Sequence, residues 1–152
     1  MCIRDRVQSA LVQICDMSQM PVCAERDAFI AHAQQLSDAF MQIMKAPYMR
    51  LRLDVISHNA CSRFHIDALT ARLICTYRGM GTQYGLANAA GDPETIHAVP
   101  TGAAIVLRGK RWPSKAKVDL VHRSPPIQGT GQTRLVLVLD PIASLDEGSN
   151  GA

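Results

Sequence analysis

The chain has 152 residues, of which 47% are hydrophobic and 19% charged, and its formal net charge at pH 7 is +3. A chain of this length fits one domain with a hydrophobic core of its own, and this composition excludes an intrinsically disordered protein. The small, scattered positive charge gives no indication of a nucleic-acid partner, and no apolar run reaches the roughly 18 residues that a membrane helix needs.

The N-terminal part of the chain, residues 7–46, has the pattern of a helical segment. A short helix is predicted over residues 7–14, and apolar residues recur at helical spacing over residues 22–45, until Pro47 ends the pattern. The preceding residues 1–6 (Met-Cys-Ile-Arg-Asp-Arg) resemble a translated sequencing-adapter scar, so we expect them to be non-native.

After Pro47 the apolar period changes from about 3.6 residues to about 2, which predicts a β domain over residues 47–141. Glycine and proline turns separate short strands, and no crossover helix follows any of them. We therefore expect a mainly β fold, a double-stranded β-helix of the jelly-roll or cupin-like barrel type, with the N-terminal helices packed on one sheet. Residues 142–152 are predicted to be a disordered tail. The expected strands cover residues 49–56, 63–66, 72–77, 82–84, 95–99, 103–107, 118–122 and 134–140.

His65 and Asp67 form a His-x-Asp pair next to one of these strands. Two residues apart on extended backbone, they project from the same face and can hold one metal ion together. His122, at the end of an apolar strand, is the candidate for a third ligand. Two imidazoles and one carboxylate on one face leave three positions of an octahedral metal open, which is the arrangement of non-haem iron(II) oxygenases.

Arg134 begins the last apolar strand, twelve residues after His122. If its guanidinium points into the interior, it needs an anionic partner. A dicarboxylate co-substrate would supply one through a bidentate pair, so Arg134 is the candidate for binding such a molecule.

The segment from Leu51 to Asp140 has a His-x-Asp pair, then a distal His and then an Arg. In this order of motifs it resembles the Fe(II)/2-oxoglutarate-dependent dioxygenase superfamily. Many members place Ser or Thr two residues after the arginine, where this chain has Val136, so the resemblance leaves Tyr77 or Arg72 to supply that contact. It implies a metal-dependent dioxygenase, an oxidoreductase that acts on a small-molecule or other unidentified substrate. By the resemblance, the iron ligands are His65, Asp67 and His122, and the 2-oxoglutarate contacts are Arg134, Tyr77 and Arg72.

A closer resemblance is to an uncharacterised bacterial domain family with no established activity. It rests on a Cys-x-x-Phe-His-x-Asp segment at residues 61–67, an Arg-Leu-x-Cys-Thr-Tyr-x-Gly-x-Gly-Thr segment at 72–82, His-Arg-Ser-Pro-Pro at 122–126 and a terminal Arg-Leu-x-Leu-x-Leu-Asp at 134–140.

The five cysteines lack a Cys-x-x-Cys spacing, which indicates reduced thiols in a cytoplasmic protein. Cys61 and Cys75 are expected to be small buried residues near the site, while Arg123 and Ser124 would orient His122 or touch substrate. The alternative is a non-catalytic zinc-binding or metal-homeostasis module on the same barrel, in which Cys61 or Cys75 joins the metal and no 2-oxoglutarate is used.

Overall fold

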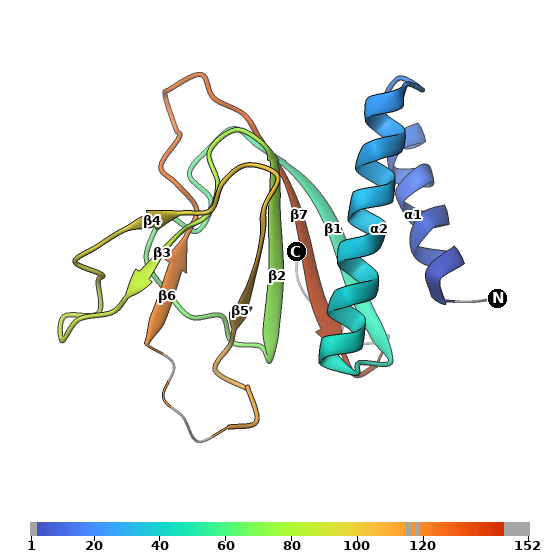
Figure 1. The fold of residues 1–152 in the computed structure, drawn as a ribbon. Helices are drawn as coiled ribbons and strands as arrows, with labels where there is room; N and C mark the ends of the chain where they lie inside the picture. Colours follow the sequence, from blue (N-terminus) through green and yellow to red (C-terminus); the bar gives the residue numbers. More distant parts are fainter. Residues whose placement is uncertain (1–2, 115–116, 118, 145–152) are drawn as a thin grey trace. The chain divides into compact units, whose positions relative to one another are not determined.

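The computed structural model describes residues 3–114, 117 and 119–144 (Figure 1). The chain divides into two compact units, Met1–Ala46 and Pro47–Ala152. The first is helical and the second is built from β-strands. Within the described part of the chain, no helix has the length and apolar character needed to cross a bilayer.

The helical unit consists of α1 (Ile3–Met17) and α2 (Ala24–Met44), which contact each other. α1 therefore starts within the segment that the sequence analysis set aside as a scar, and it is longer than the helix predicted over residues 7–14. An ion pair of 2.6 Å between the nearly buried Arg26 and Asp16 links α2 to α1. α2 ends at Lys45, which adopts the left-handed conformation and donates its backbone N–H to Met41.

The β unit contains two antiparallel sheets (Figure 1). The larger sheet has the strand order β1-β7-β2-β5, so the first strand of the unit pairs with the last. The smaller sheet has the order β4-β3-β6. The predicted mainly β architecture with N-terminal helices is confirmed. The strands are β1 (Tyr48–Ile56), β2 (Ala71–Arg78), β3 (Gln83–Leu86), β4 (His97–Ala98), β5 (Ala104–Arg108), β6 (Leu120–Arg123) and β7 (Arg134–Ile142).

Three predicted elements differ from the structure. The strand expected at residues 63–66 is reduced to a single bridge between His65 and His122, and the strand expected at 95–99 is only two residues long. β7 continues to Ile142 because it pairs with the full length of β1, so the predicted tail starts later than expected. The rest of that tail, residues 145–152, and Val118 lie outside the described residues.

The two sheets enclose a cavity of ≈ 140 Å³ that receives side chains from both. From β7 come Arg134, Val136 and Val138, and from β1 come Arg52 and Asp54, which lie beside them in the register. The neighbouring β7 side chains Leu137 and Leu139 alternate to the opposite face, where both are fully buried. The charged face of β1, and not its Leu51-Leu53-Val55 face, therefore lines the interior near the site.

The loop after β2 is held against the loop after β4 by a very close approach of two backbones. A methyl group added at Gly81 would lie 1.8 Å from the carbonyl oxygen of Val99. Gly81→Ala is therefore expected to lower the free energy of unfolding by about 2–3 kcal/mol, measured by urea denaturation. Gly129→Ala is the control, because that position has open space and only a positive φ of 80°, and its expected cost is about 1 kcal/mol. Equal losses in the two variants would contradict the prediction.

Candidate metal centre

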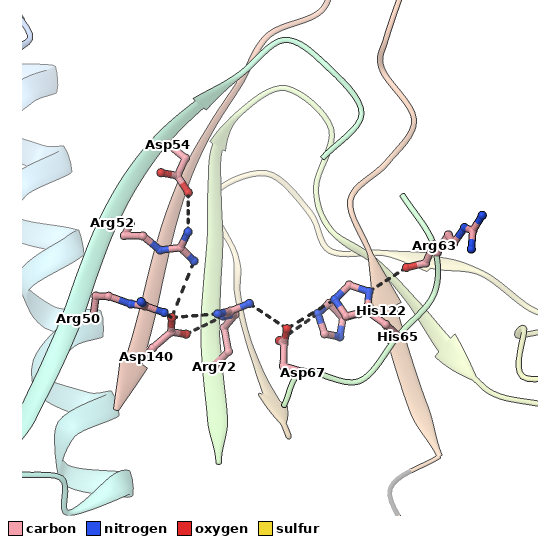
Figure 2. A network of polar contacts seen from close by, with 9 residues as sticks. All are labelled: Arg50, Arg52, Asp54, Arg63, His65, Asp67, Arg72, His122 and Asp140. Atoms are coloured by element: carbon pink, nitrogen blue, oxygen red, sulfur yellow. Dashed lines mark hydrogen bonds and ion pairs between the residues drawn. The ribbon is translucent and has the colours of Figure 1, made fainter. Parts of the chain in front are cut away.

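The structure brings the side chains of His65, Asp67 and His122 together (Figure 2), and the two histidines line the cavity. Their nearest ligand atoms all lie within 4.8 Å of one another. The two histidines belong to antiparallel segments, and each donates its backbone N–H to the carbonyl of the other at 3.0 Å. Asp67 follows two residues after His65 and faces the same point, as the His-x-Asp spacing predicts.

The hydrogen bonds around His65 leave one ring nitrogen available as a ligand. Nδ1 lies 2.8 Å from the carbonyl oxygen of Arg63, so it is the nitrogen that carries the proton in the neutral ring. Nε2 then presents a lone pair to Asp67 Oδ1, 3.5 Å away. An imidazole lone pair and a carboxylate oxygen repel each other at this distance, and a metal ion bound by both residues would offset that repulsion.

The carboxylate of Asp67 is a second feature that fits a bound metal ion. Its buried Oδ2 atom has no hydrogen-bond partner of suitable geometry among the described residues, and Nε2 of His122 lies 3.3 Å from it. Burial raises the pKa of the Asp67 carboxyl. The adjacent His122 imidazole and the positive charge of Arg72 lower this pKa by more than burial raises it, so the net pKa lies below its ordinary value. A buried carboxylate that stays ionised beside two imidazoles is a suitable donor set for a divalent transition metal.

Arg72 lies between two carboxylates. Its Nη1 atom donates to Oδ1 of Asp67 at 2.9 Å, while Nε and Nη2 donate to the two oxygens of Asp140 at 2.6 and 2.9 Å. Arg50 donates to Asp140 as well, at 2.9 Å. Arg72, which the resemblance implies as a 2-oxoglutarate contact, does line the cavity, but its guanidinium already has two acidic partners.

Arg134 is the largest fully buried side chain among the described residues, and it has no acidic partner there. Its Nε donates to the carbonyl of Met80 at 2.7 Å, and its Nη2 lies 3.3 Å from the hydroxyl of Thr76. Burial lowers the pKa of the guanidinium, since neither partner carries a charge. This uncompensated cation lines the same cavity as His65 and His122.

Tyr77 and Cys75 lie away from the cavity. They share the face of β2 opposite to Arg72 and Thr76, and their side chains are hydrogen-bonded to each other. Burial raises the pKa of both side chains. The structure therefore does not bring Tyr77 to the position expected for a 2-oxoglutarate contact, nor Cys75 to the metal ligands.

Cys61, Arg123 and Ser124 do line the cavity, but Cys61 is exposed and not buried as predicted. Cys61 accepts the backbone N–H of Ser124 at 2.9 Å and thereby ties the loop before His65 to the end of β6. Arg123 stacks on Phe64 at 4.4 Å and donates to Gln83 at 2.8 Å, next to His122 in β6. Among the described residues, the cluster of close ligand atoms contains neither cysteine.

Asp140 gives the β unit an acid-sensitive contact. Burial raises the pKa of its carboxyl, but the hydrogen bonds and charges of Arg72 and Arg50 outweigh burial, and the net pKa is below the ordinary value. A folded-state pKa below the unfolded-state value stabilises the fold above the unfolded pKa, which is about 4, and this stabilisation is lost as pH falls through the folded-state value. The urea midpoint should thus fall below pH 4, and less steeply in Asp140→Asn. An equally steep fall in the variant would contradict the prediction.

Comparison with known proteins identifies the family of the chain. Residues 2–140 match the family described as "Protein of unknown function (DUF1826)". The chain belongs to this family. The search of the curated proteins found no match for this DUF1826 chain. The predicted relationship to an uncharacterised domain family is confirmed.

Among solved structures, the DUF1826 chain is similar to a Pseudomonas putida prolyl-4-hydroxylase, with 17% identity, coverage of 93% of this chain and 83% of that chain, and a TM-score of 0.50. A rice dioxygenase for auxin oxidation matches at 16% identity over 80% of this chain and 48% of that one, with a TM-score of 0.47. Iron(II) HppE in complex with substrate matches at 14% identity over 63% and 47%, with a TM-score of 0.40. The DUF1826 chain spans about half the length of the last two proteins. The predicted resemblance to the dioxygenase superfamily is confirmed at the level of the fold.

Proposed function

We propose that this protein is an oxygenase that uses Fe(II) and 2-oxoglutarate to oxidise an unidentified substrate. One observation carries the proposal: the buried, uncompensated guanidinium of Arg134 lines the same cavity as the histidines of a His-Asp-His cluster. A metal centre alone does not require an arginine there. A dicarboxylate that reaches from the metal to Arg134 accounts for both features.

In this proposal the β unit is a double-stranded β-helix. The antiparallel sheets on either side of the cavity and the similarity to the prolyl-4-hydroxylase fold support this assignment.

The residues of the proposed site have different roles. His65, Asp67 and His122 would hold Fe(II), which when bound would supply O2 activation coupled to oxidation of 2-oxoglutarate. Arg134 binds the far carboxylate of the co-substrate through its unused donors. Val136 and Val138 keep water away from this contact, which strengthens it.

Thr76 takes the role that the resemblance left to Tyr77 or Arg72. It pairs with Val136 in neighbouring strands, and its hydroxyl lies 3.3 Å from Nη2 of Arg134. The hydroxyl that many members of the superfamily carry on the arginine strand would here come from β2.

The proposal is tested by incubating purified protein with Fe(II), 2-oxoglutarate and O2 and measuring succinate. Slow uncoupled turnover without added substrate is expected, and it should require Fe(II) and vanish in His65→Ala. Metal content is measured in parallel by inductively coupled plasma mass spectrometry. One equivalent of zinc, with neither binding nor turnover of 2-oxoglutarate, would refute the oxygenase and favour a non-catalytic zinc module.

A further inference from the structure

We infer that Asp140 is a positioning residue for the metal centre, which acts through Arg72 on the ligand Asp67. The inference rests on the proposed metal-binding function and deepens it, because it assigns a role in metal binding to a residue more than 70 positions away in the chain from Asp67. Figure 2 shows the line of contacts that starts at Arg50 and Arg52 and passes through Asp140, Arg72 and Asp67 to the histidines.

The first step is the contact between Asp140 and Arg72. Two hydrogen bonds of 2.6 and 2.9 Å join Nε and Nη2 to the two carboxylate oxygens, which is the bidentate geometry that fixes the guanidinium plane. The Asp140 side chain is only 3% exposed, and Arg50 supplies a further hydrogen bond of 2.9 Å from β1. Asp140 is thus held on β7 between two arginines that belong to the strands on either side of it.

The second step is the contact between Arg72 and Asp67. With Nε and Nη2 committed to Asp140, Arg72 directs Nη1 at Oδ1 of Asp67. This bond sets the rotation of the Asp67 carboxylate, so Oδ2 is the oxygen without a hydrogen-bond partner. Oδ2 is also the oxygen next to Nε2 of His122, at 3.3 Å.

The consequence is a carboxylate that meets a metal ion through one oxygen, because the other is occupied by Arg72. One-oxygen coordination leaves more positions on the metal open than a bidentate carboxylate would. The pair of Arg72 and Asp140 also balances charge: the guanidinium lies between two carboxylates, so Asp67 keeps much of its negative charge for the metal. Arg72 alone, without Asp140, would pair with Asp67 more completely and compete with the ion.

The test compares metal binding by the full chain and by Asp140→Asn, which keeps the size of the side chain but removes its charge. Co(II) is titrated into metal-free protein under anaerobic conditions, and both calorimetry and the visible absorption of bound Co(II) are recorded. We expect Asp140→Asn to bind Co(II) about 10- to 100-fold more weakly, with a changed absorption spectrum, because loss of an outer partner disturbs a ligand to that extent. Arg72→Lys, which can hold only one carboxylate at a time, is the second variant and should give the same result if Asp140→Asn does not fold.

Asp16→Asn is the matched control. It removes a carboxylate from the buried Arg26 in the helical unit, so it tests loss of an ion pair that does not belong to the β unit. Its Co(II) affinity and spectrum should equal those of the wild type. An affinity of Asp140→Asn within twofold of the wild type, with an unchanged spectrum, would overturn the inference even if the wild type forms succinate. A wild type that binds Co(II) tightly but never turns over 2-oxoglutarate would overturn the oxygenase alone, and one that binds no metal would overturn both.

Discussion

Arg134→Met is expected to abolish 2-oxoglutarate binding while leaving metal binding intact. The substitution removes the buried cation that has no acidic partner among the described residues, and truncating one partner of a buried charge pair costs roughly 2–5 kcal/mol of binding. The dissociation constant of 2-oxoglutarate, measured by calorimetry on the metal-loaded protein, should rise about 30-fold or more. Succinate formation should fall with it.

The same variant should have nearly normal stability without ligand. Arg134 loses two hydrogen bonds to neutral acceptors, but an uncompensated charge also leaves the interior, so we expect the free energy of unfolding to stay within about 1 kcal/mol of the wild type. Arg108→Gln is the control, since Arg108 stacks on Trp112 at 5.2 Å and does not line the cavity. If Arg134→Met binds 2-oxoglutarate as tightly as Arg108→Gln does, Arg134 is not the anion site.

Asp67→Ala, in contrast to Arg134→Met, is expected to abolish metal binding. The variant removes the only carboxylate in the described cluster of ligand atoms, and Arg72 keeps its bidentate partner Asp140, so the β unit should still fold. The Fe(II) or Co(II) affinity should fall by more than about 100-fold, beyond the loss that an outer partner causes.

A surface carboxylate serves as the comparison for Asp67→Ala. Asp119 pairs with Lys117 at 2.9 Å in an exposed position, and Asp119→Asn should leave the metal affinity unchanged. The interpretation of the centre would be wrong if Asp67→Ala still bound one metal ion with wild-type affinity.

The residues of the metal centre could be proposed from sequence because their geometry is local or repeated along the chain. The His-x-Asp spacing places His65 and Asp67 on one face wherever the backbone is extended, and a single bridge to His122 keeps it extended here. An arginine at the start of an apolar strand was a sufficient signal for Arg134, since burial of that strand takes the guanidinium inside.

Asp140 and its contacts could not be predicted in the same way, because they depend on the order of strands in the sheet. β7 lies between β1 and β2, and only this order puts Asp140 between Arg50 and Arg72. The sequence carried one weak signal: an aspartate at the end of a long apolar run, on a strand that was expected to be buried. A buried charge needs partners, but the neighbouring sequence does not indicate which residues they are.

Tyr77 shows the limit of counting alternate residues. It is an odd number of positions from Arg72, so it lies on the other face of β2 from the guanidinium, with Cys75. The register between β2 and β7 also shifts between Thr76 and Arg78. Of the two neighbouring residues Thr76 and Tyr77, Thr76 has the hydroxyl that lies beside Arg134, although it was not a predicted site residue.

The paired backbone hydrogen bonds of His65 and His122 have a consequence for how fast the ion is exchanged. The spacing of the two imidazoles is fixed when the β unit folds, so little conformational entropy is left to lose on loading, and uptake should be fast. The bridge is isolated on the His65 side, because the residues next to His65 belong to no strand, and local opening of it would carry His65 away from its partners. The rate of ion release should therefore follow the rate of amide hydrogen exchange at His65. A larger free energy of local opening should make both rates slower.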